Sequence, residues 1–130
     1  MSTDLTIDVA RRQVVGVVRG RLTAADLQAG FLAMIAHPDY QPGMSALLDL
    51  TDGHLSEALT LEDLHAHAEL IAAHESRRGR DSRSAFVAPD DLDYGMLRSF
   101  EAIAGDLPMK VAVFRTRAEA VNWLSGDGQT

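Results

Sequence analysis

Cysteine is absent from the 130-residue chain. Its absence excludes disulfide bonds, thiolate metal sites and a cysteine nucleophile, and it is typical of a reducing compartment, so we expect a cytoplasmic location. Basic residues are few, because 12 lysines and arginines stand against 19 acidic residues and give a formal net charge of -7. Nucleic acid is therefore not an expected partner, since binding to the phosphate backbone needs clustered basic side chains.

Long apolar runs are missing as well. No stretch approaches the about 18 apolar residues that a membrane span requires, and the first residues include Asp4 and Asp8 and have no signal-peptide core. Apolar residues make up 46% of the chain and charged residues 24%, which is close to the average for globular domains. At this length we predict a single domain over residues 1–130, with 126–130 as a flexible tail.

Short apolar segments predict the strands. Alternation over 5–9 indicates an edge strand, and the continuous apolar run 14–18 indicates a covered strand that forms a hairpin with it. Three further apolar runs, at 46–50, 85–88 and 111–114, are each followed by a helical pattern. Helices of about a dozen residues between short strands are typical of parallel pairing. We therefore predict an α/β fold, a mostly parallel five-stranded sheet with an antiparallel N-terminal edge strand and four helices.

Capping residues place the helix starts. Thr23, Thr60 and Thr116 each precede a carboxylate by three residues, which predicts three capped helices. The remaining helix is expected to begin at Pro89-Asp90-Asp91. Its predicted buried face is Leu92, Met96, Phe100 and Ile103, and that of the last helix is Ala120, Val121, Trp123 and Leu124.

Four segments carry a family resemblance. They read HPDYQPGM at 37–44, LLDL at 47–50, SAFVAPDDLDYGMLRSFEAI at 84–103 and VAVFRTRAEAVNWL at 111–124. Together they resemble the small stand-alone SpoIIAA-like proteins of the STAS superfamily. The resemblance implies a mostly parallel sheet with helices and a regulatory or ligand-binding role without catalysis. Because other small members of that group are linked with CRAL-TRIO lipid-binding domains, it also leaves an apolar ligand open.

One motif of the STAS superfamily is missing. Relatives that antagonise anti-sigma factors are switched by phosphorylation of a serine in an Asp-Ser-Ser-Gly-like turn after the central strand. The corresponding segment here is Asp49-Leu50-Thr51-Asp52-Gly53. The nearest hydroxyls belong to Thr51 and Ser56, where an added phosphate would meet the like charge of Asp52 or Glu57. The residues therefore do not support that switch.

Polar side chains gather after the predicted parallel strands, where ligands bind in open α/β sheets. We predict a ligand or partner surface formed by Thr51, Asp52, His54, Ser56, Asp90, Asp91 and Tyr94, with Asp93 and Arg115 close by. Several acids at one edge could hold Mg²⁺, but Asp90 and Asp91 are equally explained as acids that stabilise a helix N-terminus. Gly95 indicates either close helix packing or a place for Tyr94 at a ligand mouth or interface.

Two other groups of residues invite a functional interpretation. His65, His67 and Glu69 could suggest a metal site, but the helical spacing does not bring the histidines together, so a solvated helix flank is expected. The basic run Arg77, Arg78, Arg80 and Arg83 is expected to form a solvated loop, the alternative being a surface for an anionic partner.

No catalytic signature is present, neither a nucleophile elbow nor a glycine-rich phosphate loop. We therefore predict no enzyme, no cofactor and no metal. The leading hypothesis is a regulatory domain that binds a protein partner or a second copy of itself, as in a homodimer. The alternative is a carrier of a small apolar, lipid-like ligand beneath the helix that contains Met96, Leu97 and Phe100.

Overall fold

Strand β2 (Gln13–Leu22) is the longest strand, and three other strands pair with it. The computed structural model describes residues 2–126, in which β2 pairs antiparallel with β1 (Ser2–Asp8). On its other side, the first half of β2 pairs parallel with β3 (Ser45–Asp49). Its last three residues pair parallel with the short strand β4 (Gly53–Leu55). The predicted N-terminal hairpin with an inner second strand is confirmed.

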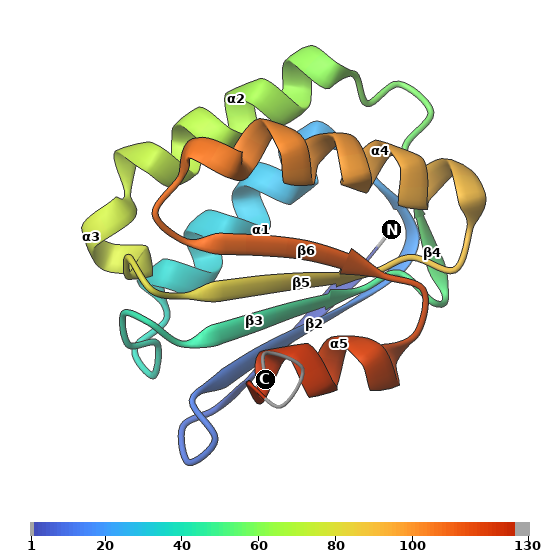
Figure 1. Cartoon of the computed structure of the whole chain (residues 1–130). Helices are drawn as coiled ribbons and strands as arrows, with labels where there is room; N and C mark the ends of the chain where they lie inside the picture. The colour runs from blue at the N-terminus through green and yellow to red at the C-terminus, as the bar shows by residue number, and fades with distance from the viewer. Residues whose placement is uncertain (1, 127–130) are drawn as a thin grey trace.

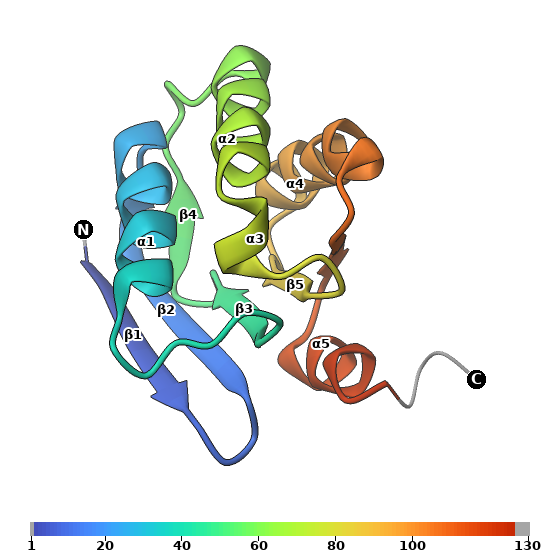
Figure 2. The same ribbon diagram turned by 90° about the vertical axis from the view of Figure 1, so that its left-hand side faces the viewer.

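Parallel pairing continues from β3 to β5 (Arg83–Val87) and then to β6 (Lys110–Phe114). The main sheet therefore has the order β1-β2-β3-β5-β6. Helices α1 (Ala24–Ala36), α2 (Leu61–Ala73) and α4 (Asp91–Ile103) cover one face, and α5 (Arg117–Leu124) covers the other (Figures 1 and 2). Two short segments, α3 (Glu75–Arg78) and the 3-10 helix η1 (Ala104–Asp106), complete the chain.

Threonine capping boxes begin three of the helices, as the sequence predicted. The hydroxyls of Thr23, Thr60 and Thr116 each accept a hydrogen bond from the backbone three residues on, whose carboxylate accepts one in return. Asp90 caps α4 by accepting from the backbone N–H groups of Leu92 and Asp93. These caps fix where each helix leaves the edge of the sheet.

Apolar side chains are buried on both faces of the sheet. The larger cluster lies under α1, α2 and α4 and includes Val18, Phe31 and Phe100. The smaller one lies under α5 and includes Leu47 and Ala120. Burial on both faces explains why the parallel strands read as continuous apolar runs in the sequence. No helix among residues 2–126 is long and apolar enough to cross a membrane.

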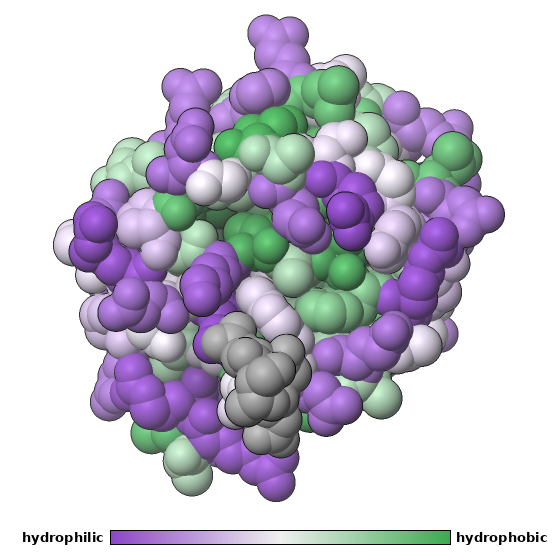
Figure 3. All heavy atoms as spheres, viewed as in Figure 1, coloured by the Kyte–Doolittle hydropathy of each residue, from purple (hydrophilic) through white to green (hydrophobic). Residues whose placement is uncertain are grey.

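Strand β6 is an open edge of the sheet. Its backbone N–H at Val113 does not meet another strand but donates to the Glu101 carboxylate, which reaches over from α4 (3.2 Å). Figure 3 shows apolar side chains in the middle of this face, between α4 and α5, surrounded by polar ones. The edge is therefore partly covered by side chains of its neighbouring helices.

The element count differs from the prediction, because residues 2–126 form six strands and five α-helices. The extra strand, β4, lies inside the segment 51–60 that was expected to be a loop. It forms because β2 is twice as long as β3, so the far half of β2 offers free backbone groups. The extra helix is the single turn α3. Of the predicted tail 126–130, all but Gly126 lies outside the described residues.

Two predicted inward-facing residues point outward. Leu92 is 82% exposed, because the buried face of α4 is formed by Asp93, Leu97 and Phe100. Asp93 faces inward because it accepts hydrogen bonds from β4, and this rotates Leu92 into solvent. Val121 of α5 is 43% exposed, and Ala120 makes the buried contact with the sheet instead.

Candidate functional site

The predicted polar surface lies where β3, β5 and β6 end, next to β4 and the start of α4 (Figure 1). We call this edge the rim and define it by the residues Thr51, Asp52, His54, Ser56, Asp90, Asp91 and Tyr94. Parallel pairing brings these residues to one edge, although 43 positions separate the first from the last in the chain. Their contacts divide the rim into three groups.

His54, Asp90 and Asp93 form the first group. Nδ1 of His54 lies 3.0 Å from Oδ2 of Asp93, and the other carboxylate oxygen of Asp93 accepts from the backbone N–H of Leu55 (3.1 Å). Which of the two atoms donates in the first contact depends on the tautomer of His54. Ligand atoms of the three side chains lie within 4.8 Å of one another, which makes this the group in residues 2–126 that could hold a metal ion.

The bonds within this group also explain it without a metal. Asp90 uses one carboxylate oxygen to cap α4, and Asp93 uses both of its oxygens to connect α4 to β4. Asp93 is buried, at 5% exposure, whereas the side chain of His54 is 54% exposed. The sequence did not indicate that Asp93 is the buried residue among these acids. Its position three residues after the capping Asp90 is consistent with an inward-facing first turn, but that signal is weak.

The second group consists of the residues that contact Arg115. Its guanidinium lies 4.0 Å above the ring of Tyr94, pairs with Asp91 at 2.7 Å and donates to the carbonyl of Pro89. Gly95, next to Tyr94, is exposed, and a Cβ there would meet no other atom within 4 Å. Close packing therefore does not account for this glycine. The contacts instead hold Tyr94 flat against Arg115 at the surface.

Asp49, at the end of β3, organises the third group. It is buried and accepts from the backbone N–H of Thr51 at 2.8 Å and from Arg117 at 3.1 Å. The Thr51 hydroxyl also donates to it. Asp52 is exposed in the following turn. Ser56 continues the pairing of β4, because its N–H donates to the carbonyl of Leu22.

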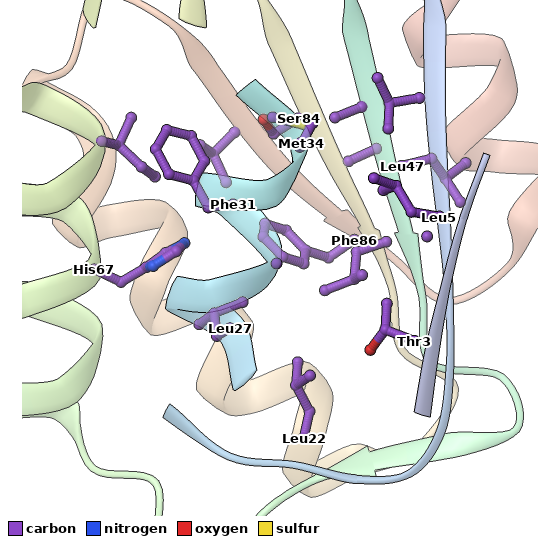
Figure 4. A pocket seen from close by; sticks show the side chains of 18 of the residues that line it. Thr3, Leu5, Leu22, Leu27, Phe31, Met34, Leu47, His67, Ser84 and Phe86 are labelled. Carbon is purple, nitrogen blue, oxygen red and sulfur yellow. The ribbon is translucent and has the colours of Figure 1, made fainter. Parts of the chain in front are cut away.

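A second candidate site is an apolar cavity of about 110 Å³ between the sheet and helices α1 and α2, a location that the sequence did not indicate. Figure 4 shows its lining, with Leu27, Phe31 and Met34 of α1, His67 of α2 and Phe86 of β5 around one space. Gly30 on α1 lines it too, and a Cβ there would meet nothing within 4 Å. The missing side chain at Gly30 is one reason that space remains.

His67 is the polar side chain of interest in this cavity. It is 4% exposed, not part of a solvated flank as expected, and its ring lies edge-on to Phe31 and tilted against Phe100. Burial lowers the pKa of His67 from 6.5 to about 4, so the ring is neutral at neutral pH. Its Nδ1 is the buried side-chain polar atom without a hydrogen-bond partner in the described part of the chain. Sequence spacing could have placed it, because it lies three residues after Leu64 and four before Ile71 on the apolar face of α2.

The basic run also behaves unlike a solvated loop. Arg78 is 1% exposed and lines one end of the cavity. Its terminal nitrogens donate to the Tyr40 hydroxyl, the Met44 and Arg83 carbonyls and the Ser84 hydroxyl. Arg80 remains at the surface and pairs with Glu75. The expectation was wrong for Arg78 because its acceptors come from segments distant in sequence.

The apolar ligand site predicted beneath α4 is only partly matched. Phe100 lines the cavity, but the other lining residues come mainly from α1, α2 and the sheet, and Met96 and Leu97 are not among them.

The exposed side of the lining includes Leu5, which is 38% exposed, together with Leu27 and Gly30. We infer that the cavity opens between β1 and α1.

Comparison with known proteins identifies the fold. No family model matches the chain, and no curated protein matches it significantly in sequence. An uncharacterized protein of the DUF3478 family with a SpoIIAA-like fold from Shewanella loihica PV-4 aligns with a TM-score of 0.57 and 18% identity, over 95% of this chain and 92% of that chain. The anti-sigma factor antagonist SpoIIAA in its unphosphorylated form aligns with a TM-score of 0.54 and 12% identity, over 96% of this chain and 99% of that chain. The fold predicted from the sequence resemblance is thus confirmed, and this chain is a small α/β protein with the SpoIIAA-like fold.

Proposed function

We propose that this chain is a non-enzymatic binding domain that holds a small, mainly apolar molecule in the cavity between the sheet, α1 and α2. The observation that carries the proposal is an apolar space whose lining includes one buried imidazole, that of His67, as Figure 4 shows. Ligand sites are typically apolar pockets with a few placed polar groups. The SpoIIAA-like fold is compatible with this role, since it supports a regulatory or interaction domain.

The size of the cavity limits the ligand. At about 110 Å³ it is somewhat smaller than an engineered apolar cavity of about 150 Å³ that takes up benzene. A molecule built around one six-membered ring, or a short alkyl chain, is therefore the expected cargo. A larger lipid would need α1 to move away from β1.

Substitution of Gly30 tests this proposal. Gly30→Leu should fill the cavity and abolish binding of toluene, measured by titration of the protein in two-dimensional NMR spectra. Gly95→Leu is the matched control, because Gly95 is also inside a helix with open space at its Cβ but lies at the surface. If toluene shifts no signals of the cavity residues in the wild-type protein, or if Gly30→Leu binds as well as Gly95→Leu, the cavity is not a ligand site.

A second candidate function is binding of a protein partner, or of a second copy of the chain, at the rim. It is favoured by Leu92, whose 82% exposed side chain lies beside Asp91 in the first turn of α4. A partner that covered the rim would bury this leucine, so Leu92 is the residue that tests the contact. Partner capture by the wild-type protein should be lost with Leu92→Asp and kept with Val121→Asp, which changes an exposed apolar residue on the opposite face. Equal capture by both variants would exclude Leu92 from the contact.

A further inference from the structure

We infer that the ligand of the cavity is a small apolar monocarboxylate, whose carboxylate lies at the end of the cavity formed by Arg78 and Ser84. The inference rests on the proposed function and adds the charge and the orientation of the ligand. Arg78 is 1% exposed and lines the cavity, yet the ion pairs among residues 2–126 all involve other basic side chains. A carboxylate in the cavity would provide the missing negative charge, because a buried charge is usually paired.

The hydrogen bonds of Arg78 hold its guanidinium in place but do not neutralise it. Its two terminal nitrogens donate to the hydroxyls of Tyr40 and Ser84 and to the backbone carbonyls of Met44 and Arg83. All four acceptors are neutral oxygens, and the guanidinium itself keeps its proton in proteins. A fixed positive charge therefore lies next to the apolar space. Because this side chain is already ordered, an anion would bind near it without the entropy loss of ordering a free side chain.

Ser84 is the group at this end that a ligand would contact directly. It is half-buried and lies two positions before Phe86 on β5, so both side chains are on the face of the sheet that lines the cavity (Figure 4). Its oxygen accepts from Arg78 at 2.9 Å, whereas its own O–H has no acceptor among residues 2–126. A ligand carboxylate would accept this proton at about 2.7 Å and would then lie within about 6 Å of the guanidinium.

The two ends of the cavity differ in charge, and this difference orients the ligand. Arg77 donates to the Ile35 carbonyl in the last turn of α1 (2.6 Å), which places its neighbour Arg78 at that end of the helix. Asp26 lines the cavity from the first turn of α1, and its hydrogen bonds to Thr23 lower its pKa, so it is negatively charged at neutral pH. Nine residues, or about 13 Å of helix, separate it from Ile35. The carboxylate of the ligand therefore lies toward Arg78 and its apolar part toward Asp26.

Benzoate, benzamide and toluene provide the test, because they share one ring and differ in charge and hydrogen bonding. Each would be titrated into the wild-type protein at pH 7.5 and constant ionic strength, with the NMR signals of the cavity residues as the readout. Competition with toluene would show that benzoate occupies the same space. Benzoate should bind at least about tenfold more tightly than benzamide, which has nearly the same shape but no charge.

Substitution of Ser84 tests the direct contact. Ser84→Ala should weaken benzoate binding about tenfold and leave toluene binding nearly unchanged, because toluene does not use the hydroxyl. Ser99→Ala is the matched control, since it removes a hydroxyl that bonds to the Gly95 carbonyl on α4, outside the cavity lining. It should change neither affinity. Arg78→Gln should abolish the preference for benzoate over benzamide; if this variant does not fold, the wild-type preference and Ser84→Ala decide the result.

Each contrary result refutes a specific step. Benzamide bound by the wild-type protein as tightly as benzoate would refute the carboxylate, and so would unchanged benzoate binding in Ser84→Ala. Benzoate that fails to displace toluene would refute it as well. In these cases toluene binding at the cavity residues would leave the proposed function standing. If neither toluene nor benzoate perturbs the cavity residues of the wild-type protein, the proposed function itself fails and the inference with it.

Discussion

The buried neutral His67 should make the stability of the fold depend on pH in a defined window. Its pKa is about 4 in the folded protein, against 6.5 in an unfolded chain. When the pH falls below 6.5, the unfolded state takes up a proton that the folded state does not, so unfolding becomes more favourable. The stabilisation is therefore complete above pH 6.5 and is lost between pH 6.5 and 4. The slope is at most about 1.4 kcal/mol per pH unit, and the total loss is roughly 3 kcal/mol.

The assay is urea unfolding between pH 7.5 and 4, followed by the fluorescence of Trp123, the single tryptophan of the chain. The free energy of unfolding of the wild-type protein would be compared with that of His67→Leu. Other titrating groups contribute equally to both proteins, including Asp26 and Arg78 in the cavity lining. We expect the difference between the two proteins to grow by roughly 3 kcal/mol in favour of His67→Leu as the pH falls through the window.

Parallel stability profiles for the two proteins would refute this reasoning. They would mean that His67 is protonated as easily in the folded state as in the unfolded one, and hence that its ring reaches water. A His65→Leu variant is the control, because His65 is exposed on the same helix. Its profile should follow that of the wild-type protein.

Three further predictions concern two backbone positions and the link between β4 and α4. Gly30→Ala should raise the free energy of unfolding by about 0.5–1 kcal/mol, because alanine favours the helix and its Cβ meets only open space. Gly79→Ala should lower the free energy of unfolding by about 2 kcal/mol or more, because φ of Gly79 is +99° and a Cβ would lie 2.2 Å from the nitrogen of Gly43. Urea unfolding midpoints of the two glycine variants measure both effects. Midpoints equal to that of the wild-type protein would contradict both predictions. Asp93→Ala should cost about 1–3 kcal/mol by leaving the Leu55 N–H without its acceptor, and amide hydrogen exchange at Leu55 should become faster. Unchanged exchange there would show that Asp93 does not hold β4 in place.

Hydrophobic periodicity and threonine caps were sufficient to predict the order of strands and helices. They could not predict β4, because a three-residue strand has too few side chains to show alternation and forms only where β2 extends beyond β3. The prediction that Arg78 lies in a solvated loop was also wrong, since a charged residue next to a glycine normally lies in solvent. Its burial depends on acceptors such as Tyr40 and Met44, more than 30 positions away in the chain.

The two candidate sites differ in how far the sequence could indicate them. The rim follows from topology, because side chains after parallel strands must meet at one edge. The cavity depends on how completely side chains fill the space between the helices and the sheet. Hydrophobic periodicity indicates which face of a helix is buried, but it does not indicate whether the side chains of that face fill this space. Gly30 and His67 were visible in the sequence, but their meeting around one space depends on how α1 and α2 pack on the sheet.

The contact between Glu101 and β6 bears on self-association. An open strand edge is a template for pairing with another chain, which can lead to aggregation. Here one N–H of that edge, at Val113, already has an acceptor from the protein's own α4. A second copy that added a strand at β6 would have to displace this carboxylate and leave a negative charge near the new junction. The side chain of Glu101 thus disfavours the addition of a further strand at β6. A homodimer of this chain is expected to use a surface other than β6.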